Sequence, residues 1–181
     1  MSKTRKKQTA DKSVYFWALA RITLGFTFLW AFFDKLLGLG FATCRDKKTD
    51  IVVYMCEKTW INGASPTEGF LKFGTKGPLS DVFQAMAGNS LIDFLFMTGL
   101  FLIGLSLILG VGMRIATISG AILLMLMWLA TLFPENNPFV DEHVIYSIVL
   151  LGLLYSNNRQ VWGFRKWWIR QNIVKQFPIL E

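Results

Sequence analysis

The only histidine of this chain stands in the run Asp141-Glu142-His143, at the start of the last long apolar segment. Ionisable side chains beside hydrocarbon are costly, so this run is either a set of helix-end polar groups or a site. Carboxylates in a first helical turn complement the positive end of the helix dipole, which accounts for Asp141 and partly for Glu142. The dipole does not explain His143, because a protonated histidine would be disfavoured at that end. A neutral imidazole held by a carboxylate fits better and could donate or accept a hydrogen bond. His143 is therefore the leading candidate for a proton-handling or ligand-binding group, with a plain structural role as the alternative.

Two basic residues lie within the first apolar segment. On a helix, steps of three and four residues place a stripe on one face, made of Arg21, Gly25, Phe28, Phe32 and Lys35. An arginine that faces lipid at depth is expensive, so we expect this stripe to face the protein interior. The alternative for Arg21 is a long side chain that extends to cytoplasmic lipid phosphates.

Two aspartates have simpler explanations. Asp34 points about 100° away from Lys35, so we expect it to pair with another helix or to lie in the headgroup layer. Asp93 ends the run Ser90-Leu91-Ile92-Asp93, which matches a capping box and requires no ligand. The outer ends of the first, second and fourth apolar segments would still bring four ionisable groups to one membrane level: Lys35, Asp93, Glu142 and His143.

The elements that position these residues are apolar segments long enough to cross a bilayer. The chain has 181 residues, of which 53% are hydrophobic, above the roughly 45–50% typical of soluble domains. A membrane-spanning helix needs about 20 apolar residues. Segments 13–39, 91–111, 115–133 and 138–156 qualify, with Asn137 as the expected N-cap and Pro138 as the first helical residue of the last. The sequence predicts an all-α integral membrane protein with a four-transmembrane-helix bundle over residues 13–156.

Basic residues predict the orientation. Eleven lysines and arginines lie in residues 1–12, 114 and 157–181, against six in residues 40–90. By the positive-inside rule both termini are cytoplasmic, and we expect a multi-pass protein of a prokaryotic cell (inner) membrane. We expect residues 1–12 to form a basic tail, 40–90 a structured external loop with a short helix near 80–87, and 157–181 an amphipathic tail with one interfacial helix. The net charge of +7 therefore reflects topology and contact with membrane lipids, and not nucleic-acid binding.

Both cysteines, Cys44 and Cys56, fall in the external loop. A disulfide is permitted outside the cytoplasm, and this one would close a short ring. Free thiols and a redox-cycling pair are the alternatives, although no CxxC motif favours the latter.

Several cofactors have no matching residues. One histidine and no CxxC motif leave no bis-histidine haem site, copper centre or thiolate zinc site, and no dinucleotide-binding glycine motif is present. We therefore expect no haem, flavin or metal. A redox role would need a diffusible quinone, the Cys44/Cys56 pair or a partner subunit.

The order and spacing of several short motifs resemble the DoxX/DoxD family from about Phe16 to Tyr155. These motifs are Arg21-xxx-Gly25 followed by Lys35, the stretch from Gly63 to Phe70 (GASPTEGF), the stretch from Leu107 to Arg114 (LILGVGMR), and Glu142-His143. That family includes the membrane subunit of thiosulfate:quinone oxidoreductase, which works with a second subunit. The resemblance implies a four-helix membrane bundle and a link to the quinone pool. Distant relatives act as membrane partners or assembly factors.

Two functions from different classes follow. The first is a quinone-linked oxidoreductase subunit that acts on a small sulfur compound or another reductant. Here Arg21 or Lys35 would polarise a quinone oxygen, and His143 with Glu142 would pass protons. Trp30 and Phe32 would form walls of the quinone slot. The alternative is a non-catalytic membrane scaffold or assembly partner of a larger complex, which would use the large loop and the Trp-rich tail as binding surfaces. A small-solute transporter is a third, lesser possibility.

Overall fold

The fold is all-helical in the part of the chain that the computed structural model describes, residues 12–46, 48–134, 137–156 and 160–181. Three helices are long and apolar enough to cross a membrane: α1 (Ser13–Leu37), α4 (Ser90–Leu109) and α5 (Met113–Ala130). A fourth apolar helix, α6 (Glu142–Ser156), has 15 residues. These helices indicate a membrane protein by their length and composition.

The last apolar helix begins later than expected. The predicted N-cap at Asn137 and helix start at Pro138 are wrong, because α6 begins at Glu142. The Asn137 side chain instead accepts hydrogen bonds from the backbone N–H groups of Phe139 (3.0 Å) and Val140 (3.3 Å), which closes a turn before the helix. Asn competes for nearby backbone groups in this way, so its presence marks a turn as readily as a cap.

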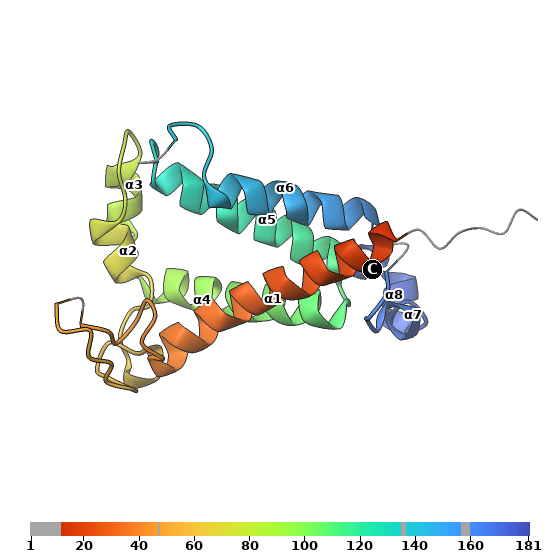
Figure 1. Cartoon of the computed structure of the whole chain (residues 1–181), viewed down its shortest axis with the longest axis horizontal. Coiled ribbons are helices and arrows are strands. Elements are labelled where there is room, and N and C mark those ends of the chain that lie inside the picture. The colour runs from red at the N-terminus through yellow and green to blue at the C-terminus, as the bar shows by residue number, and fades with distance from the viewer. Residues whose placement is uncertain (1–11, 47, 135–136, 157–159) are drawn as a thin grey trace, which may run out of the picture.

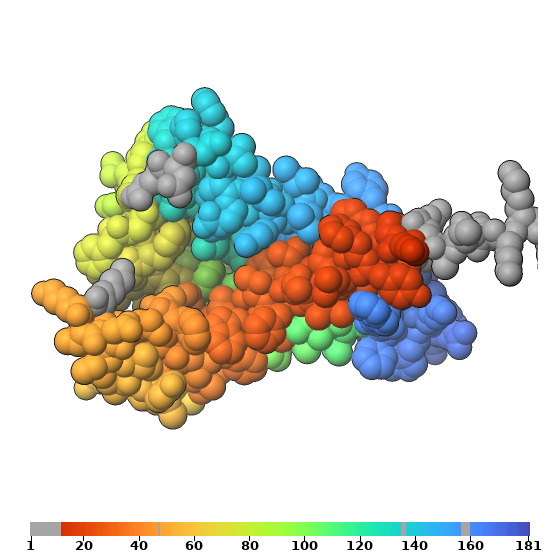
Figure 2. Space-filling model, in the orientation of Figure 1, coloured from red at the N-terminus to blue at the C-terminus, as the bar shows by residue number. Residues whose placement is uncertain are grey.

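The helices form two pairs that diverge along the bundle (Figure 1). α1 packs along α4, and α5 packs along α6. A tight turn at Gly110-Val111-Gly112 joins α4 to α5. The pairs lie close together at the end that carries the C-terminal helices and separate at the other end. There the short helices α2 (Glu68–Phe73) and α3 (Ser80–Ala85) lie between them. Figure 2 shows the residues between α1 and α4 covering this wide end.

One layer of side chains joins all four long helices. A Cβ atom built on Gly120 of α5 would lie 2.9 Å from Leu150 of α6, 3.2 Å from Ile103 of α4 and 3.7 Å from Phe28 of α1. Phe28, Ile103 and Leu150 are all buried. Lipid tails are as apolar as these side chains, so close packing, more than hydrophobic burial, holds such a layer together in a bilayer.

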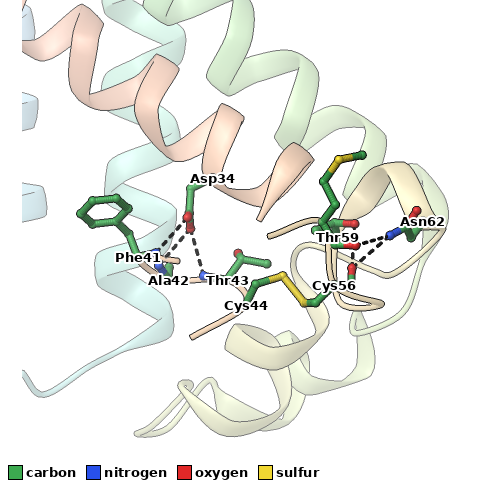
Figure 3. Close-up of a disulfide and its surroundings, with 9 residues drawn as sticks. Asp34, Phe41, Ala42, Thr43, Cys44, Cys56, Thr59 and Asn62 are labelled. Atoms are coloured by element: carbon green, nitrogen blue, oxygen red, sulfur yellow. Dashed lines mark hydrogen bonds between the residues drawn. A yellow bond between two sulfur atoms is a disulfide. The ribbon is translucent and has the colours of Figure 1, made fainter. Parts of the chain in front are cut away.

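The C-terminal end of α1 is tied to the loop that follows it (Figure 3). The buried Asp34 carboxylate accepts hydrogen bonds from the backbone N–H groups of Phe41 (3.0 Å), Ala42 (2.9 Å) and Thr43 (3.0 Å). Asp34 therefore binds the loop after its own helix, and the alternative that it pairs with another helix is wrong. The next residue, Cys44, forms a disulfide with Cys56, which closes the loop. Trp60–Asn62 then forms the 3-10 helix η1.

The C-terminal tail forms short helical segments in place of one interfacial helix. These are α7 (Arg165–Trp168), α8 (Asn172–Gln176) and the 3-10 helix η3 (Pro178–Leu180). The tail folds back on the start of α5, where the Arg114 side chain lies 3.2 Å from the Glu181 carboxylate and the Arg114 N–H donates to the Glu181 carbonyl at 2.8 Å. Inside the tail, the Trp168 indole donates to the Leu180 carbonyl at 2.6 Å.

The backbones of α1 and α4 approach each other closely at two glycines. A Cβ on Gly25 would lie 2.9 Å from the Gly104 carbonyl oxygen, and a Cβ on Gly104 would lie 2.9 Å from the Gly25 carbonyl oxygen. The two backbones therefore touch without an intervening side chain, as small residues allow at membrane helix interfaces. Gly99 of the same helix α4 has open space at its Cβ position and serves as a matched control.

We expect Gly104→Ala to lower the free energy of unfolding by about 1–3 kcal/mol, because its methyl group would force α1 and α4 apart. Gly99→Ala should leave stability unchanged or raise it by up to about 1 kcal/mol, since alanine favours the helix over glycine. Thermal unfolding of both variants in detergent, followed by circular dichroism, measures the difference. Equal stability of the two variants would contradict the backbone contact.

Candidate functional site

The sequence-predicted site residues lie at two ends of the bundle. Arg21 is 1% exposed, and its guanidinium donates hydrogen bonds to carbonyls at the end of α4, those of Leu107 and Ile108 (2.8 Å). It also donates to the carbonyls of Val161 (3.4 Å) and Trp162 (2.7 Å), beyond α6. The last carbonyls of a helix have no intrahelical donors, so a buried arginine satisfies them. The Nη atoms are thus occupied by backbone groups and do not extend to lipid phosphates.

The structure does not bring Arg21 together with the other expected quinone contacts. Arg21 and Lys35 are fourteen residues apart on α1, a distance of about 21 Å along the helix. Trp30 is partly exposed and stacks on Phe26 and against Phe41. Phe32 packs instead on Phe101 of α4, with ring centroids 5.0 Å apart. These four residues therefore do not line one slot.

Asp93 has a different role from the predicted one. The N-cap of α4 is Asn89, whose side chain accepts a hydrogen bond from the Leu91 N–H at 2.9 Å, so the capping box does not form. The buried Asp93 carboxylate accepts from the hydroxyls of Ser65 (2.8 Å) and Thr67 (2.5 Å) and from the Thr67 N–H (3.3 Å). It thereby anchors the GASPT turn of the loop to α4.

His143 is paired with Asp141. The His143 Nδ1 atom lies 2.7 Å from the Asp141 Oδ2 atom, and both side chains are largely buried. The other oxygen of the same carboxylate accepts from the backbone N–H groups of His143 (3.0 Å) and Val144 (3.2 Å). Asp141 is thus both the N-terminal cap of α6 and the partner of the imidazole. Glu142, which the sequence suggested would pass protons together with His143, is exposed, and among the described residues it forms no bond to His143.

This pair lines a cavity of about 310 Å³ at the wide end of the bundle. The cavity wall comes from the start of α6, the end of α5 and the connection between α2 and α3. Its lining includes Lys76, Thr131, Phe133, Asn137, Asp141, Glu142 and His143. Within the described ranges no group bonds the Nε2 atom of His143, so this nitrogen is available to a ligand. Lys76 was missed by sequence reasoning, because nothing in its local sequence marks it.

A backbone contact brings Lys76 to this wall. The Lys76 N–H donates to the Ala130 carbonyl at 2.9 Å, next to a bridge between Lys76 and Thr131. The following residue, Gly77, has a positive φ of 78°, and a Cβ there would lie 1.9 Å from the Leu132 carbonyl oxygen. Only glycine permits this approach. The loop between α2 and α3 is therefore held against the end of α5.

Helix register places Lys35 at the level of His143. Starting from the shared layer of Phe28, Gly120 and Leu150, Lys35 lies seven residues outward on α1 and His143 seven residues outward on α6. Seven residues are two helical turns, about 10 Å, so each returns to the inward face. Trp128 lies eight residues outward from Gly120, and its buried indole N–H has no partner among the described residues. No bond joins Lys35 to His143 among those residues.

The cavity combines an imidazole that can exchange protons, that of His143, with a cation, Lys76. An imidazole whose Nδ1 is fixed by a carboxylate presents Nε2 as the exchanging atom. Among the residues described, no three histidine, cysteine, aspartate or glutamate side chains form a group that could hold a metal ion. Comparisons of the chain with protein-family models, with curated proteins and with solved structures give no match.

The carboxyl of Asp141 has a pKa below its ordinary value. Burial raises this pKa, but hydrogen bonds from the His143 ring and from the Val144 and His143 N–H groups lower it by more. A depressed pKa in the folded state stabilises the protein above the unfolded-state pKa of about 3.9, and this contribution is lost as the pH falls through the folded-state value.

We expect Asp141→Asn to lower stability at neutral pH by about 1–2 kcal/mol, because asparagine caps a helix equally well but removes the charge-assisted bonds. The difference from the unchanged protein should shrink as the pH falls below about 4. Thermal unfolding between pH 3 and 7 measures it, with the exposed Asp81→Asn as control. A difference independent of pH would contradict the depressed pKa.

Proposed function

We propose that this protein is a DoxX/DoxD-like membrane subunit that couples oxidation of a small anionic reductant to reduction of a quinone. One observation carries this proposal: the Asp141–His143 pair lines a cavity in the wide end of an apolar helical bundle, with Nε2 unoccupied among the described residues. A quinone needs an apolar environment to arrive from the membrane and a proton donor at its oxygen. This cavity lies at the end of the apolar helices, and the imidazole of His143 lines it.

The proposed topology has α1, α4, α5 and α6 crossing the membrane, with both termini cytoplasmic. The distribution of basic residues supports it, as does the turn between α4 and α5 at the narrow end. α6 has 15 residues, about 22 Å, so it would need the residues before Glu142 or local thinning of the bilayer to span fully. The His143 cavity would then open at the outer face.

The chemistry assigns a role to each polar group of the cavity. Reduction of a quinone to quinol takes two electrons and two protons. Two thiosulfate anions supply the electrons when a sulfur–sulfur bond joins them as tetrathionate. His143 would give a proton from Nε2 to a quinone oxygen, and Asp141 would stabilise the imidazolium that precedes transfer. Lys76 would attract the anionic donor, and Glu142 at the exposed rim would return protons from water.

A role for Lys35 as a second cation beside Lys76 remains a prediction, because Lys35 lies at the same membrane level as His143. Arg21, Trp30 and Phe32 are not part of the proposed quinone site, because they lie on other faces or at the other end of α1. The donor oxidation would involve a partner subunit on the outer surface.

A scaffold function is the second candidate, and exposed apolar side chains of the loops favour it. Tyr54, Phe73 and Phe139 are each at least 70% exposed at the wide end of the bundle. Such residues mark surfaces for a partner or for membrane. In this case Asp141 and His143 would serve only to start α6.

We expect His143→Gln to lower the turnover number for quinone reduction by about 100-fold or more, because glutamine keeps the polarity but has no group that gains or loses a proton near neutral pH. The measurement follows decylubiquinone absorbance with thiosulfate as donor, in membranes that contain the chain and its partners. Tyr146→Phe, on the exposed part of the same helix, should leave the rate unchanged.

An unchanged rate in His143→Gln would remove His143 from the reaction. If the unchanged protein co-purifies with a stoichiometric partner, contains no quinone and gives no turnover with sulfur donors, the scaffold function replaces the oxidoreductase.

A further inference from the structure

The connection between α5 and α6 carries exposed apolar side chains beside the His143 cavity. Phe133 is 61% exposed, Phe139 is 73% exposed and Val140 is 43% exposed. None of the residues described in this connection, 131–134 and 137–140, is charged. Figure 1 shows the connection as an arc that projects sideways from the ends of α5 and α6, and Figure 2 shows its side chains protruding there. Exposed apolar side chains of this kind are covered either by a partner or by lipid.

Helix lengths place this connection below the outer end of α4. From the shared layer of Ile103, Gly120 and Leu150, α6 extends eight residues, to Glu142, which is about 12 Å along the helix. From the same layer α4 extends thirteen residues, to Ser90, which is about 20 Å. The connection therefore starts about 8 Å nearer to the layer than the end of α4.

The outer turns of α4 are themselves apolar and exposed. Leu91, Phe94 and Leu95 are exposed on this helix, which is apolar enough to cross a membrane. Leu91 lies twelve residues outward from Ile103, about 18 Å along the helix. The apolar exposed surface of α4 thus continues past the level at which α6 begins. A bilayer that covers this surface also reaches the connection between α5 and α6.

Hydrogen bonds within the chain satisfy backbone groups of this connection. The Asn137 side chain accepts from the N–H groups of Phe139 and Val140, and the Asp141 carboxylate accepts from two N–H groups at the start of α6. Irregular backbone that faces lipid is excluded from the hydrocarbon core, because its free polar groups would have no partners there. A connection with these internal bonds and apolar side chains fits the boundary between headgroups and acyl chains.

We propose that the connection between α5 and α6 is inserted into the outer leaflet of the bilayer, with the side chains of Phe133 and Phe139 among the lipids. The proposal rests on the topology given above, in which α6 crosses the membrane, and the inserted connection completes the crossing of a helix of 15 residues. Phe133 and Val140 also line the His143 cavity. A lipophilic molecule therefore enters this cavity from the bilayer. A protein partner is the less favoured occupant, because the exposed apolar surface of α4 spans the same level.

The experiment measures the depth of a nitroxide label in the membrane. The two cysteines of the chain form a disulfide, so one added cysteine takes the label alone. The labelled variants are Phe139→Cys and Val140→Cys in the connection, Leu102→Cys on the exposed apolar middle of α4, and Asp81→Cys on exposed α3. The full chain is reconstituted in dioleoylphosphatidylcholine vesicles. Power-saturation electron paramagnetic resonance then compares collisions with oxygen, which concentrates in hydrocarbon, and with water-soluble nickel ethylenediaminediacetate.

We expect the ratio of oxygen to nickel collisions at positions 139 and 140 to exceed that at position 81 by at least about threefold and to approach that at position 102, because interfacial apolar side chains lie about 5–10 Å inside the boundary. Phe139→Cys changes an exposed side chain, and circular dichroism checks that the helices stay folded. Phe133→Cys reports the same insertion if a label at position 139 disturbs folding.

A ratio at position 139 equal to that at position 81 would overturn the insertion. A ratio at position 140 equal to that at position 81, together with a high ratio at position 139, would overturn the entrance from the bilayer. The measurement requires no turnover, so a protein that inserts its connection but reduces no quinone would contradict the proposed reaction and leave the insertion supported.

Discussion

The guanidinium of Arg21 binds carbonyl oxygens of two segments that lie far from it in sequence, the end of α4 and the residues after α6. This one side chain fixes the narrow end of the bundle. With that end fixed and Gly25 pressed against Gly104, the register of α1 on α4 is set, and the layer of Phe28, Ile103, Gly120 and Leu150 follows. The positions of Lys35 and His143 two turns further out depend on this register.

Three carboxylates repeat the same principle at the wide end. Asp34 and Asp93 accept hydrogen bonds from backbone N–H groups of loop segments beside their helices, and Asp141 accepts them from the first residues of α6, which it caps. A buried carboxylate needs hydrogen-bond donors, and backbone N–H groups near hydrocarbon need acceptors. Each of these bonds therefore satisfies a carboxylate and a backbone N–H group together. Ionisable residues of this bundle are therefore mostly anchors for loops. His143 differs from them, because its side chain is held on one side and lines a cavity on the other.

Sequence reasoning succeeded where a pattern is local. The inward stripe of α1 and the short helix α3 follow from local periodicity, and the structure confirms both. It failed where the partner is remote or where neighbours compete. Asp93 binds residues 26 and 28 positions away, Lys76 reaches its wall through the Ala130 carbonyl, and Arg21 binds both of its segments at long range. Asn89 outcompeted Ser90 as the cap, and Asp141 replaced Glu142 at His143, because one-residue shifts in a helix start are not encoded by composition.

The loop after α1 is stabilised almost entirely by its own neighbours. Asp34 binds residues only seven to nine positions ahead, and the ring closed by Cys44 and Cys56 lies directly beyond. A chain made from its N-terminus can therefore complete α1 and this ring before the ribosome has synthesised α4. The GASPT turn must wait for Asp93, and the connection between α2 and α3 must wait for Ala130. The cavity of His143 must wait for the start of α6, and the narrow end closes later still, when Val161 and Trp162 reach Arg21 and Glu181 reaches Arg114.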